Sequence, residues 1–218
     1  MTDAADRRFD AVIFDLDGVI TDTADLHARG WERLASEEGL DFDDDLADRL
    51  RGVSRVDSMR TIAGDRGYSD DEIRELADRK NGYYVELLST LKPSDTLPGA
   101  RGLVTACRDR GMRVAICSSS RNARTVLDAL DMTGHFDQIT NGDAAERSKP
   151  APDLFLHCAQ QLEVEPGRCV VVEDAASGVE GANAAGMRSV GVGPPDRLGA
   201  ADQRYDSVAD IDVDAILG

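Results

Sequence analysis

The sequence predicts an α/β fold: a Rossmann-like parallel sheet with helices on both faces, plus a helical bundle inserted after the first strand. Short, fully apolar runs that suit buried parallel strands alternate with longer amphipathic stretches that suit helices. Between residues 22 and 91 this alternation stops, and only helical patterns occur. A chain of 218 residues is long enough to bury the core of such a sheet and to carry an insertion.

The first strand is expected at Ala11–Phe14, where an apolar run ends abruptly in Asp-Leu-Asp-Gly. Similar runs predict later strands at Met112–Cys117, Cys169–Val172 and Ser189–Val192, and a weaker one at Asp137–Thr140. Helical patterns separate them, at Ala100–Arg110, Arg121–Leu130, Asp153–Gln161 and Gly178–Ala185. A helical pattern thus lies between each predicted strand and the next, as a parallel sheet requires.

The inserted segment shows helical patterns at Leu26–Glu38, Asp44–Leu50, Arg55–Asp65 and Asp70–Leu88. We therefore predict two parts: an α/β core formed by residues 1–21 and 92–218, and a helical cap formed by residues 22–91. The segment Lys92–Gly99 contains two prolines and is the expected return connection to the core.

The amino-acid composition excludes some classes of binding partner. A net charge of −17 repels polyanions, so we expect neither nucleic acid nor an anionic membrane to bind. No apolar run approaches the ~20 residues of a membrane span. The N-terminal MTDAADRRF lacks the apolar stretch of a signal peptide, so we predict a cytoplasmic protein, and we expect a monomer. The four cysteines have no C-x-x-C spacing and are expected to be reduced and buried: Cys107, Cys117, Cys158 and Cys169.

Polar residues that follow the predicted strands are the first candidates for a site, because open parallel sheets bind ligands beyond the carboxyl ends of their strands. Asp15 and Asp17 follow the first strand, and Glu173 and Asp174 follow CVVV. Lys149, one of only three lysines, lies in a loop between a weak strand and the next helix. Three serines follow MRVAIC: Ser118, Ser119 and Ser120.

An Asp-x-Asp pair alone is weak evidence, since this Asp-rich chain repeats it in polar surroundings, for example at Asp41/Asp43 and Asp210/Asp212. Asp15 and Asp17 differ because they end a buried strand. Four converging carboxylates would repel one another unless a cation lay among them. Mg²⁺, a hard cation that prefers oxygen ligands, fits such a cluster best, and Lys149 is the expected second positive charge.

These residues resemble the four motifs of the haloacid dehalogenase superfamily, over nearly the whole length of the chain: FDLDGVITDT, the serine after the second strand, the isolated Lys-Pro and the acidic pair after CVVV. The resemblance implies that Asp15 is a nucleophile that becomes an aspartyl-phosphate, with Asp17 as general acid and base. It also implies one Mg²⁺ held by the Asp15 side chain, the Asp17 backbone carbonyl and Asp174, with Glu173 close by. Ser118 and Lys149 would bind the transferring phosphate.

These residue types suit phosphoryl transfer. A carboxylate is a competent nucleophile at neutral pH, and its acyl phosphate is labile enough to turn over. The metal and Lys149 would neutralise charge on the phosphoryl oxygens. Asp17 can protonate the leaving oxygen and then deprotonate the next acceptor. By resemblance, Asp17 excludes the dehalogenase, phosphonate-cleaving and cation-pumping branches, and leaves phosphatases and phosphomutases.

The insertion narrows the resemblance to the β-phosphoglucomutase-like subfamily, through RGVSRVDSM, DRKN, SSSRN, SKPAPD and GVGPPDRLG. The resemblance implies that a small sugar phosphate is the partner, and that β-D-glucose 1-phosphate and glucose 6-phosphate interconvert through β-glucose 1,6-bisphosphate. That intermediate would bind in two alternative orientations, so the site must hold two phosphate groups at once. Arg55, Ser120 and Asn122 would hold the distal one. The other expected substrate-binding residues are His27, Arg51, Ser58, Lys80, Ser119 and Arg121; Arg51 and Arg121 stand where relatives carry Lys.

Other interpretations remain open. The first is a phosphatase of the same scaffold that acts on small sugar phosphates or phosphoglycolate. The second is a catalytically idle interaction protein, against which the complete set of motif residues argues. Locally, Ser118–Ser120 could be a helix N-cap cluster, Arg55 and Lys80 could be solvated helix residues, and His27 could simply pack between helices.

Overall fold

The computed structural model describes residues 8–218 and contains one six-stranded sheet in the order β3-β2-β1-β4-β5-β6, in which every pair is parallel. The strands are β1 (Ala11–Phe14), β2 (Arg113–Cys117), β3 (Gln138–Thr140), β4 (Cys169–Glu173), β5 (Arg188–Val192) and β6 (Gln203–Tyr205). The α/β fold predicted from the sequence is confirmed.

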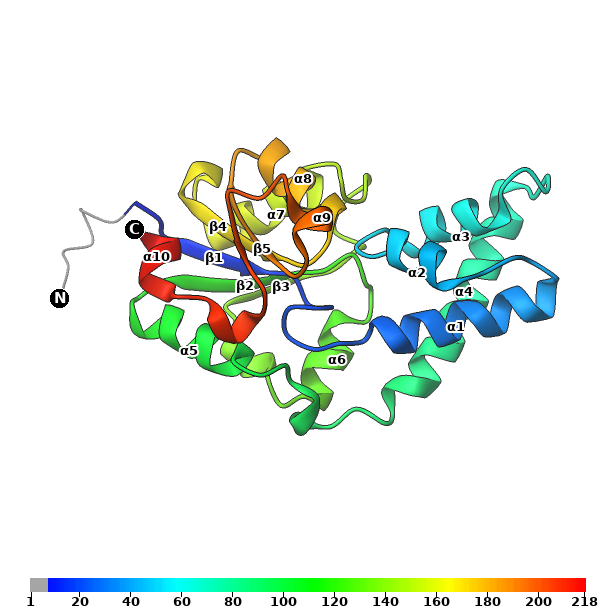
Figure 1. The fold of residues 1–218 in the computed structure, drawn as a ribbon, viewed down its shortest axis with the longest axis horizontal. Coiled ribbons are helices and arrows are strands. Elements are labelled where there is room, and N and C mark those ends of the chain that lie inside the picture. The colour runs from blue at the N-terminus through cyan, green and yellow to red at the C-terminus, as the bar shows by residue number, and fades with distance from the viewer. Residues whose placement is uncertain (1–7) are drawn as a thin grey trace.

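Helices cover both faces of this sheet (Figure 1). On one face lie α5 (Ala100–Asp109), α6 (Ala123–Ala129) and α10 (Val213–Leu217). On the other lie α7 (Asp153–Leu162), α8 (Ala176–Ala184) and the short α9 (Pro195–Leu198). Successive side chains of β1 point to opposite faces, so Val12 and Phe14 join the hydrophobic core on the α5 side, whereas Ala11 and Ile13 join the core on the α7 side.

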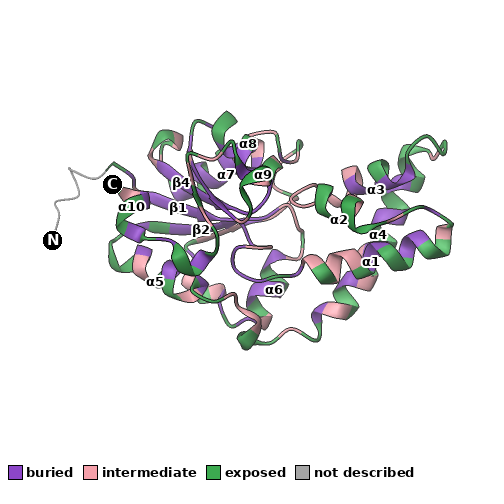
Figure 2. Ribbon diagram, in the orientation of Figure 1, coloured by how far each residue is buried: buried purple, intermediate pink, exposed green. Residues whose placement is uncertain are grey.

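A separate group of helices follows β1: α1 (Ala24–Glu38), α2 (Asp44–Arg49), α3 (Arg55–Ala63) and α4 (Asp70–Leu88). We call residues 22–91 the helical segment. It has its own hydrophobic cluster, built around residues such as Trp31, Leu34 and Leu76. Figure 2 shows this second buried zone at the end of the molecule beyond the strand ends. Only the end of α4, through Tyr84 and Leu88, joins the core of the sheet region.

Two short backbone stretches connect the helical segment to the sheet region, and they run side by side. The Leu97 amide donates to the Ile20 carbonyl at 2.8 Å, and the Thr21 hydroxyl donates to the Asp95 carbonyl at 2.7 Å. The 3-10 turn Pro93–Asp95 lies in the second stretch. The predicted return connection therefore pairs with the stretch of chain that leaves β1.

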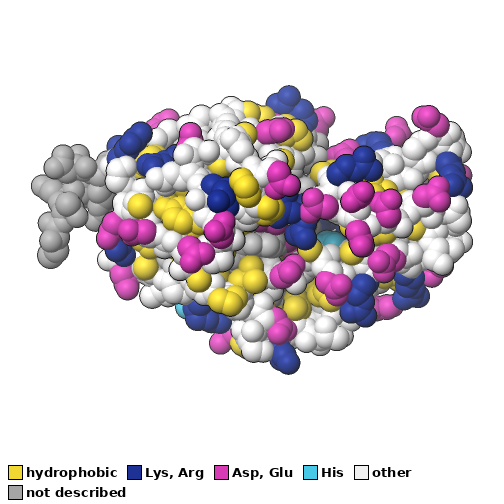
Figure 3. Space-filling model, viewed as in Figure 1, with side chains coloured by type: hydrophobic (Ala, Val, Ile, Leu, Met, Phe, Trp, Pro, Cys, Tyr) yellow, Lys and Arg dark blue, Asp and Glu magenta, His cyan; other side chains and the backbone are white. Residues whose placement is uncertain are grey.

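The structure also tests the predictions about the cysteines and about membrane-spanning segments. All four cysteines are buried and free, as predicted. In residues 8–218, no helix combines the length and apolar character needed to cross a bilayer. The prediction that no signal peptide is present concerns MTDAADRRF, and residues 1–7 of that stretch lie outside the described residues. Figure 3 shows acidic side chains spread over the visible face with basic ones among them, in keeping with the net charge.

Candidate active site

The predicted carboxylates meet where the strand order reverses. β1 lies between β2 and β4, so the residues after β1 and β4 flank one crevice at the carboxyl edge of the sheet. Asp15 and Asp174 are each 5% exposed, and Glu173 is fully buried. Gly178 in α8 makes the close approach possible, because a Cβ there would lie 1.9 Å from the Glu173 Oε1.

Lys149 is the centre of this cluster. Its Nζ donates to the Asp15 Oδ1 and to the Glu173 Oε1, both at 2.6 Å, and to the Cys117 carbonyl at 3.1 Å. Burial lowers the pKa of Lys149, but the two carboxylates outweigh burial and hold the pKa well above its usual value. The ammonium therefore stays charged across the physiological range.

The carboxylates outnumber this one ammonium. Burial, then the neighbouring Glu173 and Asp15, raise the pKa of Asp174 well above its usual value. Burial and Asp15 raise the pKa of Glu173 to about 7, against the opposing effect of Lys149. Oxygens of Asp15, Glu173 and Asp174 lie within 4.8 Å of one another. A surplus of buried carboxylate oxygens is the environment that suits a hard divalent cation, so the residues present fit the expected Mg²⁺.

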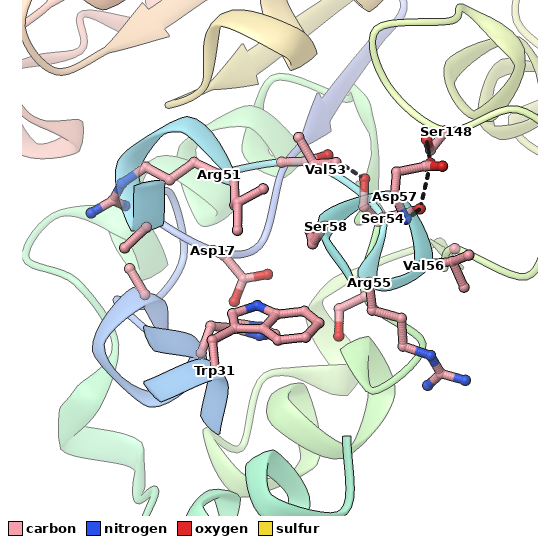
Figure 4. Close-up of a pocket in the computed structure, with 18 of the residues that line it drawn as sticks. Asp17, Trp31, Arg51, Val53, Ser54, Arg55, Val56, Asp57, Ser58 and Ser148 are labelled. Carbon is pink, nitrogen blue, oxygen red and sulfur yellow. Dashed lines mark hydrogen bonds between the residues drawn. The ribbon is translucent and has the colours of Figure 1, made fainter. Parts of the chain in front are cut away.

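Asp17 lines a cavity of about 680 Å³ between the sheet region and the helical segment. Figure 4 shows its carboxylate pointing into the cavity beside the Trp31 ring. The Thr23 hydroxyl donates a hydrogen bond to the Asp17 Oδ1. Burial and the charge of Asp15 raise the pKa of Asp17 to about 7, so a proton can reside on it near neutral pH.

Lys80 approaches this cavity from α4 and is 2% exposed. Its Nζ lies 2.7 Å from the His27 Nδ1 and 4.6 Å from the centre of the Trp31 ring. Burial lowers the pKa of Lys80 to about 7, with Asp17 opposing the shift and Arg55 adding to it. Burial and Lys80 also hold the pKa of His27 well below its usual value, so His27 is neutral and can accept a hydrogen bond from the ammonium.

Lys80→Met should therefore stabilise the protein at neutral pH. The pKa of Lys80 is about 7 in the folded chain against a usual 10.5, so the unfolded chain binds the proton more tightly between these values. The penalty is full below pH 7 and disappears as pH rises toward 10.5. We expect the free energy of unfolding to rise on the order of 1 to 4 kcal/mol at pH 7, as when a hydrophobic residue replaces a buried charge.

Urea unfolding at pH 6.5 and pH 9.5 measures this effect. Lys92→Met is the matched control, because Lys92 is exposed in the return connection. A gain of stability that does not shrink toward pH 9.5, or no gain at all, would contradict the assignment of the cost to a buried ammonium.

The serine stretch after β2 occupies the other side of the crevice. Ser118 is 1% exposed, and its Oγ accepts from the Ser120 amide at 3.0 Å. The Ser120 Oγ accepts from the Asn122 amide at 3.2 Å. Ser119 and Ser120 line the cavity. The Asn122 side chain instead donates to the Asn81 Oδ1 at 2.8 Å.

The predicted arginines take different places. Arg51 pairs with Asp174 through Nη1 at 3.4 Å, so it lies beside the acidic cluster. Arg55 and Arg121 both line the cavity, and the charge of Arg121 contributes to lowering the pKa of Arg55 after burial. The Arg55 Nη2 lies 2.5 Å from the Asp78 Oδ1, and Arg121 pairs with Asp143. Ser58 is buried, and Figure 4 shows it above Asp17 in the view.

Several hydrogen bonds join the helical segment to the sheet region around the cavity. Ser119 donates to the Gly52 carbonyl at 2.8 Å, and Ser177 donates to the Arg51 carbonyl at 3.3 Å. Across the rim, Ser148 donates to the Asp57 Oδ2 at 2.7 Å (Figure 4). The chain is thus in a closed arrangement in which the cavity over Asp15 is enclosed on several sides.

Comparison with known proteins shows which family has this sequence and fold. The haloacid dehalogenase-like hydrolase profile matches residues 9–186. The chain belongs to this family. A β-phosphoglucomutase of Bacillus subtilis is 38% identical over 210 residues, which cover 94% of this chain and 93% of that protein. A fructose-1-phosphate phosphatase of Escherichia coli is 34% identical over 186 residues, 85% of this chain and 97% of its own.

Solved structures of haloacid dehalogenase-like hydrolases share the fold. A crystal structure of β-phosphoglucomutase from Clostridium difficile superposes with a TM-score of 0.92 at 36% identity, and the match covers 95% of each chain. The family resemblance predicted from the sequence motifs is therefore confirmed.

Some residues around this haloacid dehalogenase-like site were not singled out from the sequence. Thr23 contacts Asp17, Asn81 contacts Asn122, and Ser148 contacts Asp57. Thr23 lies within FDLDGVITDT, so its place in that motif was an available signal. Asn81 lies in the motif DRKN and Ser148 in SKPAPD, but their contacts depend on how the helical segment packs on the sheet region.

Proposed function

We propose that this protein is a β-phosphoglucomutase that interconverts β-D-glucose 1-phosphate and glucose 6-phosphate. In this proposal residues 22–91 act as a cap over an α/β core of residues 1–21 and 92–218. The observation that carries it is a second pair of basic side chains, which belongs to the lining of the cavity. Arg55 and Arg121 line the cavity and each pairs with one aspartate, and the buried Arg55 Nε has no hydrogen-bond partner among the described residues. A bisphosphate intermediate needs such a second site.

In the proposed reaction, the Asp15 carboxylate attacks the phosphorus and forms an aspartyl-phosphate while the sugar oxygen leaves. Asp17 gives that oxygen a proton, and later takes a proton from the accepting hydroxyl. Lys149 holds Asp15 in place and offers positive charge to the phosphoryl oxygens, and Ser118 would bind the same phosphoryl group. Mg²⁺, when bound by Asp15, the Asp17 carbonyl and Asp174, would neutralise charge on the phosphoryl group. β-Glucose 1,6-bisphosphate would be both intermediate and activator.

The closed arrangement supports transfer to sugar over hydrolysis. An enclosed cavity keeps water from the aspartyl-phosphate until the sugar hydroxyl is in position. Lys80, His27, Ser58 and Arg51 would contact the sugar or its phosphates from the helical segment. Exclusion of nucleic acid and membranes, the monomeric state and a cytoplasmic location stay predictions that rest on the sequence.

A coupled assay tests the proposal. β-Glucose 1-phosphate is supplied with Mg²⁺ and a trace of β-glucose 1,6-bisphosphate, and glucose 6-phosphate and free phosphate are both measured. We expect glucose 6-phosphate to form well in excess of free phosphate. The second candidate is a sugar-phosphate phosphatase, favoured by the similarity to the fructose-1-phosphate phosphatase. Release of phosphate without glucose 6-phosphate would decide for that candidate.

Asp17→Asn should separate proton transfer from phosphoryl transfer. Asparagine cannot protonate a departing sugar oxygen, so the transfer rate from glucose 1-phosphate should fall about 10²- to 10⁴-fold. Acetyl phosphate releases acetate, which needs no proton, so its transfer rate should change far less. Because the pKa of Asp17 is about 7, the wild-type rate with the sugar should also decline above that pH.

Rapid-quench measurement of the phosphoenzyme with each donor checks this prediction. Asp109→Asn, an exposed carboxylate at the end of α5, is the control and should match the wild type. Equal losses with both donors would show that Asp17 does not act as the proton donor.

A further inference from the structure

An ion pair joins the helical segment to the sheet region beside the acidic cluster. Arg197 in α9 donates from Nη1 to the Asp48 Oδ1 in α2 at 2.8 Å. The same Asp48 oxygen accepts from the Arg51 Nε at 3.0 Å, and Arg51 reaches Asp174. Asp48 therefore links a residue of the sheet region to the part of the helical segment that lies over the site.

The sheet region fixes Arg197 firmly. Its side chain is 21% exposed, and the next residue, Leu198, is 1% exposed and lies against Gly191 of β5. Gly193, with a φ of +129°, precedes α9, and a Cβ there would lie 3.1 Å from the Arg197 Nη2. The turn leaves room for the guanidinium, which reaches from the sheet region to Asp48.

The Arg197–Asp48 contact is an ion pair, whereas most other contacts between the two regions around the cavity are hydrogen bonds of uncharged groups. Among residues 8–218, two ion pairs connect the helical segment to the sheet region: Arg197–Asp48 and Arg51–Asp174. Asp174 is also a candidate metal ligand, so its pairing with Arg51 competes with that role. Asp48 and Arg197 have no assigned part in the reaction, although Asp48 also accepts from Arg51 and the charge of Arg197 acts on Asp174.

We propose that the Arg197–Asp48 ion pair is a positioning element that holds the helical segment closed over Asp15. Its loss raises the fraction of open molecules, because a contact present only in the closed state shifts the balance between the two states. In the open state water reaches the aspartyl-phosphate. This consequence for hydrolysis rests on the proposed function, whereas the effect on closure does not.

The first experiment measures closure without any reaction. Trp31, the single tryptophan, is 5% exposed and lines the cavity, so quenching of its fluorescence by acrylamide reports opening. We expect quenching to increase about two- to threefold in Asp48→Asn and in Arg197→Gln, in line with a partly exposed ion pair. The double variant should be no more accessible than either single variant.

The second experiment measures the lifetime of the phosphoenzyme formed with acetyl phosphate. Both single variants should hydrolyse it about threefold faster than the wild type, because the open fraction rises by a similar factor. Arg197→Lys should recover part of the lifetime. Arg110→Gln is the control: it removes an exposed pair in which the Arg110 Nε lies 2.7 Å from the Asp214 Oδ1, far from the helical segment.

The outcomes separate the alternatives. Unchanged quenching and lifetime in Asp48→Asn would overturn the proposal. An effect of Arg197→Gln alone would also overturn it, and would assign the role of Arg197 to its charge near Asp174. If no phosphoenzyme forms in any variant, the proposed function fails, and the quenching of Trp31 still decides whether the ion pair holds the segment closed.

Discussion

Asp15→Asn is expected to abolish phosphoryl transfer while leaving the fold intact. Asparagine has nearly the shape of aspartate, but its amide oxygen is a poor nucleophile and cannot form the acyl phosphate. We expect the transfer rate to fall at least about 10⁴-fold, as for other catalytic nucleophiles. The fold should tolerate the change, because removing one of the crowded carboxylates lowers their mutual repulsion, and Lys149 keeps Glu173 as a partner.

Two measurements test this expectation together. Acid-quenched labelling with radioactive acetyl phosphate should give a phosphoenzyme in the wild type and none in Asp15→Asn, and thermal unfolding should show no loss of stability. Asp10→Asn is the matched control, because Asp10 directly precedes β1, at its other end, and pairs there with Arg168. A labelled Asp15→Asn protein would place the nucleophile elsewhere and refute the proposed mechanism.

The sheet was largely predictable because its central strands are buried on both faces. β1, β2, β4 and β5 appear within one residue of the apolar runs that predicted them. β6 was missed, since Gln203–Tyr205 is a three-residue edge strand with polar, partly exposed residues and no apolar run. α9 and α10 were missed for a similar reason: four and five residues are too few to show a helical period.

The acidic cluster was predictable by the same logic. Strand ends at the carboxyl edge of a parallel sheet lie close together, so the sequence alone placed Asp15, Glu173 and Asp174 near one another. Lys149 was a candidate because it is one of only three lysines and follows a predicted strand, but its role as a phosphate ligand came only from the motif resemblance. Arg197–Asp48 was beyond prediction, because its partners lie 149 residues apart and meet only through the orientation of the helical segment.

Lys149→Met should cost both activity and stability, for one electrostatic reason. The side chain is fully buried and offsets the charge of Asp15 and Glu173, each 2.6 Å from its Nζ. Removing it leaves buried carboxylates uncompensated, which typically costs about 3 to 5 kcal/mol. Transfer should also fall by about 10²- to 10³-fold, as when another group that stabilises transition-state charge is lost.

A double variant separates the two effects. Glu173→Gln in the Lys149→Met background removes one uncompensated charge, so the free energy of unfolding should recover in part while phosphoryl transfer stays low. Lower pH should act in the same direction: the pKa of Glu173 is already raised to about 7, and its protonation relieves the same charge. Lys92→Met controls for the loss of a lysine. If urea unfolding showed no loss in Lys149→Met, Lys149 would not be compensating the buried carboxylates. If Glu173→Gln restored transfer together with stability, Lys149 would not be acting on the phosphoryl group.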